Sequence, residues 1–339
     1  MTLGNNAAGL LLALLTALFW GALPLAVKHV LPVMDAVTLV WLRFCVAAVW
    51  IWLIPAPGRR LRTAAPAPVV PPPPRLPLRR ACLLLFVATA GLGANFVFFN
   101  SSVAYLSASA CQILAQAGPV LLLLGGVFIL REAFLPIQGV GVALLLAGLL
   151  LFFNTRLGLL WGGDSNFAFG MLLGASAALV WATYGLAQKV LLRHLTPTSI
   201  LRVIYPCCAL GLTPLASPAA ILRVDAVQGA CLAFACLNTL VAYGAFTKAM
   251  SIWHAAKVSA VVATTPLFSL VLESLLHALF PHAYPLESVG LLSLAGACVV
   301  VLGALGIAVG PMLHLPHLPR RRRRGDRRCV FFVGGRAPL

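Results

Sequence analysis

The chain has 339 residues, of which 61% are hydrophobic and only 9% are charged. A soluble globular protein carries roughly 25% charged residues, so this composition, with a mean hydropathy of +1.01, excludes that class and indicates a membrane protein. The net charge of +17 does not indicate nucleic-acid binding, because the arginines gather in one loop and near the C-terminal end rather than on a folded face.

Ten apolar segments follow one another, each bounded by charges, prolines or asparagines. A spanning helix needs about 20 apolar residues, so ten spans use roughly 200 positions and leave no room for a soluble catalytic domain. The sequence therefore predicts an all-α polytopic membrane protein with ten transmembrane helices. The expected spans are residues 7–28, 36–55, 81–100, 107–130, 134–153, 168–188, 198–216, 227–248, 257–279 and 286–309.

Two segments outside the spans carry most of the positive charge. The loop of residues 56–80 is rich in proline and arginine and is expected to be an extended linker, with docking of a proline-binding partner as the less favoured alternative. The tail of residues 310–339 contains five consecutive arginines and is expected to lie on anionic lipid. With the N-terminus inside, 19 Lys and Arg residues fall on the inner side and 3 on the outer side, which predicts that both termini are cytoplasmic.

The remaining motifs point away from catalysis. Eight of the nine cysteines lie in or beside apolar segments without C-x-x-C spacing, which favours packing over disulfides or zinc. The seven histidines are scattered, and we expect neither a metal site nor a cofactor. The chain has no G-x-x-x-x-G-K-[ST] sequence, so ATP hydrolysis is excluded as an energy source. The first apolar run is interpreted as an uncleaved helix because no basic residue precedes it.

The second half of the chain repeats the first. Residues 17–28 align without gaps over residues 178–189, and the segment from Tyr105 to Pro119 aligns with that from Ile252 to Pro266. Five spans per half force the second half to enter the membrane in the opposite sense. Such inverted repeats are typical of secondary transporters. Simple duplication for stability is the less favoured alternative.

These residues resemble the drug/metabolite transporter superfamily, in its EamA-type bacterial branch. The resemblance covers residues 9–310 and rests on the order of short motifs: Leu18-Phe19-Trp20-Gly21, Arg43, Ala108 through Pro119, Arg131-Glu132, Gly141, Gly148, Trp181, Arg202, Asn238 to Tyr243, Ala255, Pro266, Gly296 and Gly303. It implies EamA-like repeats at residues 7–153 and 168–309, a central cavity, and export or exchange of amino acids, metabolites or toxic compounds. The chain departs from the pattern at Leu279, the equivalent of Glu132, and carries Glu273 six residues earlier.

Polar residues within a span mark transport pathways unless they are paired. Glu273 and His277 share one face of the ninth span, with Thr264 and Thr265 deeper in it. A carboxylate there can bind a proton or a cationic solute, which makes Glu273 and His277 candidates for coupling. The alternative is that Glu273 pairs with the histidine or with a distant arginine for packing alone.

A set of neutral polar residues forms the second group of candidates. Gln112 and Gln116 lie four apart on the fourth span, with Asn95 on the third and Asn238 and Tyr243 on the eighth. If they face one cavity, they hydrogen-bond a polar or zwitterionic solute. Hydrogen bonding between helices is an equally favoured interpretation.

Aromatic and basic side chains form the third group. Trp20, Trp181 and Tyr184 either close the cavity or stack on a solute, or else lie in the interfacial aromatic belt. Arg43 and Arg202 fall within a turn or two of the span starts. We expect their side chains to extend to the lipid headgroups rather than to bind a solute.

The leading hypothesis is a secondary transporter that exports small organic solutes by alternating access in the bacterial inner membrane. Its expected partners are a small-molecule substrate and anionic lipid, with a homodimer left open and nucleic acid excluded. Two alternatives are weighed below it: a membrane scaffold or sensor that uses the proline-rich loop, and a membrane-embedded enzyme that modifies lipid.

Overall fold

The computed structural model describes residues 3–53, 76–132, 134–154, 158, 164–253, 255–282 and 290–309, and every regular element in these ranges is helical. This confirms the prediction of an all-helical protein. The elements are α1 (Leu3–Val30), α2 (Ala36–Leu53), α3 (Leu78–Ser102), α4 (Ala108–Ala115), α5 (Ala117–Phe128), α6 (Pro136–Phe152), α8 (Ser165–Leu191), α9 (Pro197–Leu212), the short 3-10 helices η2 (Thr213–Leu215) and η3 (Pro218–Arg223), α10 (Ala226–Ile252), α11 (Ala255–Val262), α12 (Thr265–Leu279) and α13 (Leu291–Val309).

Two predicted features fall outside the described ranges. These are the arginine-rich tail of residues 310–339 and most of the proline-rich loop, whose described part begins at residue 76. The linker and lipid-anchor roles assigned to them stay predictions, as does the cytoplasmic location of both termini.

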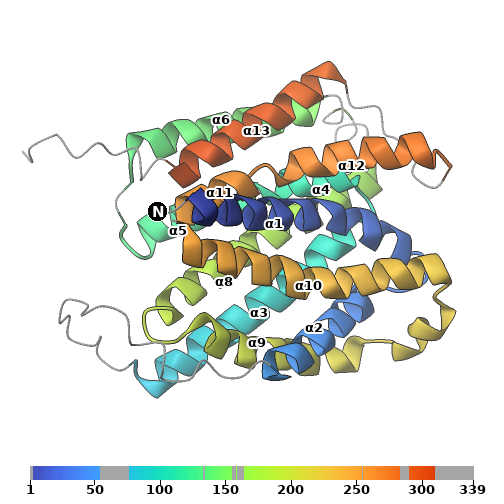
Figure 1. Ribbon diagram of the computed structural model, residues 1–339, viewed down its shortest axis with the longest axis horizontal. Helices are drawn as coiled ribbons and strands as arrows, with labels where there is room; N and C mark the ends of the chain where they lie inside the picture. Colours follow the sequence, from blue (N-terminus) through green and yellow to red (C-terminus); the bar gives the residue numbers. More distant parts are fainter. Residues whose placement is uncertain are drawn as a thin grey trace, which may run out of the picture.

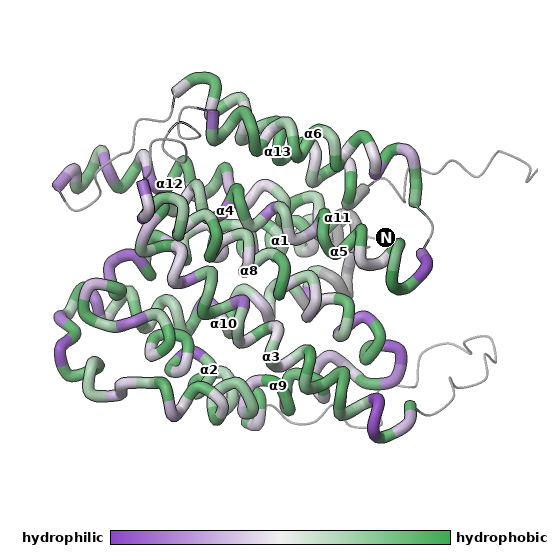
Figure 2. Tube along the Cα trace, turned by 180° about the vertical axis from the view of Figure 1, so that it is seen from behind, coloured by the Kyte–Doolittle hydropathy of each residue, from purple (hydrophilic) through white to green (hydrophobic). Residues whose placement is uncertain are grey.

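Nine helical segments in the described part of the chain are long and apolar enough to cross a membrane. The segments Ser165–Leu191 and Ala226–Phe246 lie close to the predicted spans at 168–188 and 227–248. The apolar helix α6 is shorter, at 17 residues, or about 25 Å of rise. Figure 2 shows mostly hydrophobic residues along the helix middles and hydrophilic residues mainly at the two ends of the bundle.

Carboxylates begin several of the helices. Asp164 and Asp225 accept hydrogen bonds from backbone N–H groups in the first turns of α8 and α10. Asp35 accepts one from the Thr38 N–H at 2.9 Å where α2 begins. A carboxylate at this position pairs with an N–H group that has no partner within the helix, and it interacts favourably with the helix dipole. Three acidic residues are therefore used for capping.

Two spans are broken in the middle by proline. Proline has no N–H and cannot bond the carbonyl four residues earlier. Accordingly, α4 ends at Ala115, four residues before Pro119, and α11 ends at Val262, four residues before Pro266. The Thr265 hydroxyl donates to the Val262 carbonyl at 2.6 Å, so the carbonyl that proline leaves without its helical partner is satisfied.

The closest helix pairs each join the first part of the chain to the second. Helix α6 packs against α13, α3 against α8, α1 against α10, and α2 against α9. In Figure 1, α6 and α13 lie along the top edge of the bundle, while α2 and α9 lie at the bottom. Buried apolar side chains such as Phe44, Ile113 and Ile200 fill the contacts between the helices in the bundle core. The two parts of the chain are therefore packed into one core.

Helices α6 and α13 cross on four glycines, namely Gly141 and Gly148 of α6 and Gly296 and Gly303 of α13. A Cβ atom at Gly303 would lie 2.4 Å from the Leu145 nitrogen, and one at Gly148 would lie 2.8 Å from the Gly296 carbonyl oxygen. These atoms belong to the backbone and cannot turn aside. Small residues at such a crossing allow two helix backbones to approach closely.

Candidate functional site

Three polar side chains from three helices converge on consecutive carbonyls of α1. Asn238 of α10 donates to the Phe19 carbonyl at 2.5 Å, and Gln112 of α4 donates to the Trp20 carbonyl at 2.6 Å. Ser269 of α12 donates to the Gly21 carbonyl at 2.8 Å. Helix α1 is thus held from three sides at one level, and this level is the centre of the candidate site.

Pro24 explains why the α1 carbonyls need partners there. It lies inside α1, and because it has no N–H it leaves the Trp20 carbonyl, four residues earlier, without its helical hydrogen bond. A buried carbonyl without a partner is costly in a membrane. The Gln112 amide, whose residue is 7% exposed, supplies the missing donor from another helix.

Aromatic rings lie beside this level. The Trp20 ring is 5.3 Å from the Tyr243 ring and 5.6 Å from the Phe246 ring, measured between centroids. On the α12 side, a Cβ atom at Gly21 would lie 3.1 Å from the Thr265 carbonyl oxygen. The structure therefore brings four predicted site residues together around α1: Trp20, Gln112, Asn238 and Tyr243.

A second group of predicted residues lies around α8. Asn95 of α3 donates to the Ala177 carbonyl at 2.9 Å. Tyr184 packs over Gly91, where a Cβ atom would lie 3.2 Å from the tyrosine backbone nitrogen, and the Trp181 ring packs over Gly118. Four further predicted residues lie on the broken spans.

Those four residues are Gln116, which stands at the junction of α4 and α5, Thr264 and Thr265, which donate to carbonyls of α11 at 2.6 Å, and His277 on α12. The described bonds of Gln112, Asn95 and Asn238 run between helices, and those of the threonines run to the preceding helix of their own span. Solute binding by any of these residues stays a prediction.

The Glu273 carboxylate lies at the start of α4. Its Oε2 accepts a hydrogen bond from the Ser109 N–H at 3.3 Å, and the Lys28 ammonium donates to the carbonyl of Leu106, just before α4, at 3.5 Å. A carboxylate at a helix N-terminus is stabilised by the helix dipole. Glu273 therefore joins α12 to α4, and its role in coupling stays a prediction.

The expectation for Arg43 was wrong. It is only 2% exposed and donates from Nε to the Thr239 hydroxyl at 3.1 Å and from Nη1 to the Asn100 amide oxygen at 3.3 Å. Its side chain therefore turns into the bundle rather than outward to lipid headgroups. The side chain of Arg202, which belongs to α9, is partly buried and donates to the Ile51 carbonyl near the end of α2 at 3.4 Å.

Sequence reasoning missed Asn100, Thr239 and Ser269 as members of these networks. Asn100 was read as a span boundary, although it is 1% exposed. A signal was present for Ser269, because it follows Thr265 by one helical turn and so shares its face. Asn100 and Thr239 are polar groups in or at the end of apolar runs, which is itself the signal for an interior role.

An ion pair connects the end of α5 with the end of α8. Arg131 has a φ of 57°, and the turn at this residue returns the Glu132 N–H to the Gly126 carbonyl at 3.0 Å. The Glu132 side chain then accepts from the Lys189 ammonium at 2.6 Å. The family resemblance had singled out Glu132 without predicting this partner.

We expect that Glu132→Gln changes the free energy of unfolding by less than about 1 kcal/mol. The two side chains are 48% and 35% exposed, and exposed ion pairs contribute little because water screens them. Thermal unfolding of the purified protein in low and high salt measures the effect. A loss well above that size, which salt does not reduce, would contradict this weak surface role.

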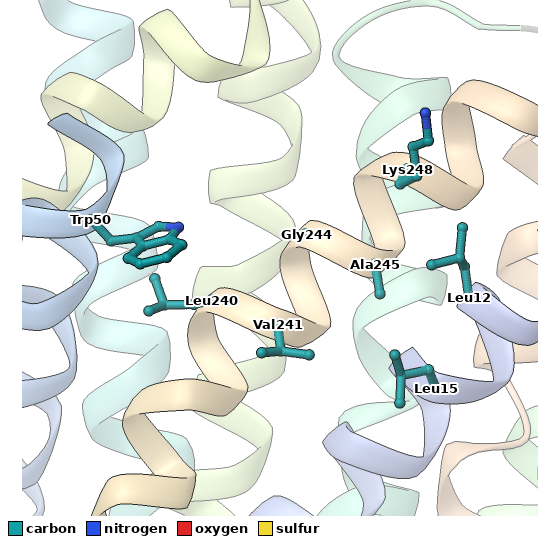
Figure 3. Close-up of a pocket in the computed structure, with 8 residues that line it drawn as sticks. All are labelled: Leu12, Leu15, Trp50, Leu240, Val241, Gly244, Ala245 and Lys248. Carbon is teal, nitrogen blue, oxygen red and sulfur yellow. The ribbon is translucent and has the colours of Figure 1, made fainter. Parts of the chain in front are cut away.

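A shallow apolar groove of about 410 Å³ lies between α1, α2 and α10. Figure 3 shows Leu12 and Leu15 of α1, Trp50 of α2 and the α10 residues around it, with Lys248 at the end nearest the last turn of α10. None of the predicted site residues lines this groove. An apolar groove open at the surface suits contact with lipid, so it does not by itself define a solute site.

The described part of the chain contains no group of three or more His, Cys, Asp or Glu side chains that could hold a metal ion. Long apolar helices that pack on glycine, break at proline and bond across the bundle through buried polar side chains define a polytopic helical membrane protein. The sequence profile of the EamA-like transporter family matches residues 7–154 and again residues 168–309. The chain therefore belongs to the EamA-like transporter family, as the resemblance implied.

Two relatives extend this result. The chain is 45% identical over 303 residues to a protein of Escherichia coli named uncharacterized inner membrane transporter YhbE, covering 89% of this chain and 91% of that protein. It is 36% identical over 309 residues to an uncharacterized transporter of Haemophilus influenzae, covering 91% and 97%. A solved crystal structure with 17% identity superposes with a TM-score of 0.55 over 90% of this chain and 97% of that one, which shows a shared fold.

Proposed function

We propose that this protein is a secondary transporter that exports small organic solutes, such as amino acids or related metabolites, across the bacterial inner membrane by alternating access. Membership of the EamA-like transporter family and two relatives named as transporters support transport. The observation that carries the mechanism is the equivalence of contacts in the two parts of the chain.

The alignment that matches Trp20 with Trp181 also matches Phe19 with Val180, and the alignment that matches Pro119 with Pro266 also matches Gly91 with Asn238. Asn238 contacts the Phe19 carbonyl. Its equivalent, Gly91, would place a Cβ atom 3.0 Å from the Val180 carbonyl oxygen. The contact between α1 and α10 therefore has a counterpart between α8 and α3.

A second pair of contacts behaves in the same way. Asn95 donates to the Ala177 carbonyl at 2.9 Å, and their equivalents Thr16 and Ala242 are joined at 3.4 Å, with Thr16 as the donor. These matches support two five-helix repeats of opposite orientation, at residues 7–153 and 168–309. Counting α6, the fifth along the chain, as a span brings the total to ten. Local thinning of the bilayer accommodates such a short helix at modest cost.

Two near-equivalent repeats can exchange roles, which gives inward-open and outward-open states of similar energy. The proline breaks in the fourth and ninth spans provide equivalent places where those spans can bend. Trp20 and Trp181, which occupy matching positions, are the proposed cavity aromatics of the two repeats. Glu273 is the proposed coupling group, because it joins α12 of one repeat to α4 of the other.

Reconstitution of the full chain in proteoliposomes tests this function. We expect at least one solute in a panel of labelled amino acids and cationic drugs to move, and an imposed pH gradient to drive it. Glu273→Gln is expected to remove the effect of the gradient, whereas Glu132→Gln, which also replaces a carboxylate at a helix end, is expected to leave it. Equal behaviour of wild type and Glu273→Gln would make Glu273 structural, and failure of the wild type to move any solute would overturn the transport proposal.

A further inference from the structure

Arg43 is a buried cation surrounded by neutral groups. Its guanidinium donates to the Thr239 hydroxyl at 3.1 Å and to the Asn100 amide oxygen at 3.3 Å, and its Cζ lies 4.8 Å from the centre of the Phe96 ring. These partners come from α10 and α3, while Arg43 belongs to α2. The charge thus lies where three helices meet, and the residue is only 2% exposed.

The acidic residues in the described part of the chain are all engaged elsewhere. Asp35, Asp164 and Asp225 cap helices. Glu132 pairs with Lys189, and Glu273 accepts a hydrogen bond from the Ser109 N–H. Among the described residues, therefore, the interactions of Arg43 supply hydrogen-bond acceptors and a π face but no countercharge.

A charged side chain within the membrane is costly and marks a functional site by default. A guanidinium binds carboxylate through two parallel hydrogen bonds, and this geometry makes arginine suited to planar anions. One positive charge balances one negative charge, which fits a carboxylate better than a phosphate dianion. The missing countercharge of Arg43 therefore corresponds to a ligand with a single carboxylate.

A second observation adds to the chemistry of this ligand. Asn238 precedes Thr239 on α10 and is only 1% exposed. Its Nδ2 donates to the Phe19 carbonyl, but its Oδ1 is buried and has no hydrogen-bond partner. Buried polar atoms without a partner are rare and call for an explanation. This oxygen can accept a hydrogen bond from a ligand N–H group.

We propose that Arg43 binds the carboxylate of the transported solute, and that this solute is a monocarboxylate with an N–H donor that Asn238 Oδ1 accepts. The inference rests on the transport function proposed above and names the chemistry of its substrate. Because the guanidinium is closed off in this structure, binding of the solute requires α10 to move away from α2 during the transport cycle. The equivalent residue of the second repeat, Arg202 of α9, makes a different contact, since its side chain donates to the Ile51 carbonyl near the end of α2.

The test compares wild type, Arg43→Gln, Arg43→Lys and the matched control Arg202→Gln as purified full-length chains. The probes are the common amino acids and, for each one that raises Tm, the amine that lacks its carboxylate and the acid that lacks its amino group. Chloride and inorganic phosphate serve as further probes. Thermal unfolding reports binding, and proteoliposome flux reports transport.

We expect some amino acids to raise Tm and to be transported, and their carboxylate-free amines to do neither. Arg43→Gln is expected to weaken binding by about tenfold to a hundredfold, because hydrogen bonds to charged groups are lost. Arg43→Lys is expected to keep part of the affinity, and Arg202→Gln to keep all of it. Without ligand, Arg43→Gln is expected to unfold no earlier than wild type, since it removes an uncompensated charge, whereas a purely structural arginine would show an earlier transition.

Three results would overturn the inference. One is carboxylate binding that is unchanged in Arg43→Gln, and another is stabilisation by chloride equal to that by amino acids. The third is transport of amines but of no carboxylate, which would leave the transport function standing and refute the role of Arg43. Conversely, carboxylate binding that depends on Arg43 without any flux would support the site and count against transport.

Discussion

Replacing Gly303 with valine is expected to prevent stable packing of α13 against α6. A Cβ atom at this position would lie 2.4 Å from the Leu145 nitrogen and 2.7 Å from the Gly141 carbonyl oxygen. Both are backbone atoms, so the two helices must separate and lose the contacts of the whole crossing. Overpacking in a core costs about 1–3 kcal/mol and occasionally more. We expect a loss at or above the top of that range, because no side chain can rotate to relieve the clash.

Thermal unfolding and size-exclusion chromatography of the detergent-purified protein measure this effect. A loss of about 3 kcal/mol lowers Tm by roughly 6–12 °C on the scale for domains of 150–250 residues, and the valine variant is expected to aggregate as well. Gly244→Val is the matched control, since a Cβ atom at Gly244 meets nothing within 4 Å. Equal stability of the two variants would show that the α6–α13 crossing does not need glycine.

Helix positions could be predicted from the sequence because the thickness of the bilayer fixes the length of an apolar run. The prediction of residues 36–55 met a helix at Ala36–Leu53, and that of 81–100 met Leu78–Ser102. The disturbance beside Gln116 was also predictable, because proline leaves a carbonyl free wherever it occurs in a helix. The same holds for the span predicted at residues 257–279, where Pro266 ends α11 at Val262 within one apolar segment, Val258–Leu279.

The partners of the polar side chains could not be predicted. A sequence gives the depth of a residue in the membrane, but it does not give the rotation of its helix or the neighbour it faces. Arg43 is an example of this limit of sequence-based prediction. Its depth suggested contact with lipid headgroups, but its side chain bonds Thr239, which is 196 positions away in the sequence. The same limit applies to Gln112, whose acceptor is a backbone carbonyl and therefore has no sequence signature.

Gln112→Leu is expected to destabilise the protein by about 1–3 kcal/mol, the cost of a buried acceptor without a partner. The Trp20 carbonyl loses its donor at 2.6 Å, and Pro24 prevents α1 from supplying another. The reason for the cost is therefore in α1, although the substitution is in α4. Gln116→Leu, one turn further on, is the control for loss of an amide from the same span.

A double-mutant cycle that combines Pro24→Ala with Gln112→Leu tests whether the two residues act on the same carbonyl. Alanine restores the N–H that can bond the Trp20 carbonyl within α1, so Gln112→Leu in this background is expected to cost much less than in wild type. Independent sites add within about 0.3–0.5 kcal/mol, and we expect an interaction energy above that range in thermal or chemical unfolding. Additive losses would mean that Gln112 acts through contacts other than the carbonyl freed by Pro24. A combined loss smaller than the sum of the single losses would show that Pro24 and Gln112 act on the same carbonyl. The proline removes the helical hydrogen bond of α1, and the glutamine of α4 replaces it at the level of the candidate site.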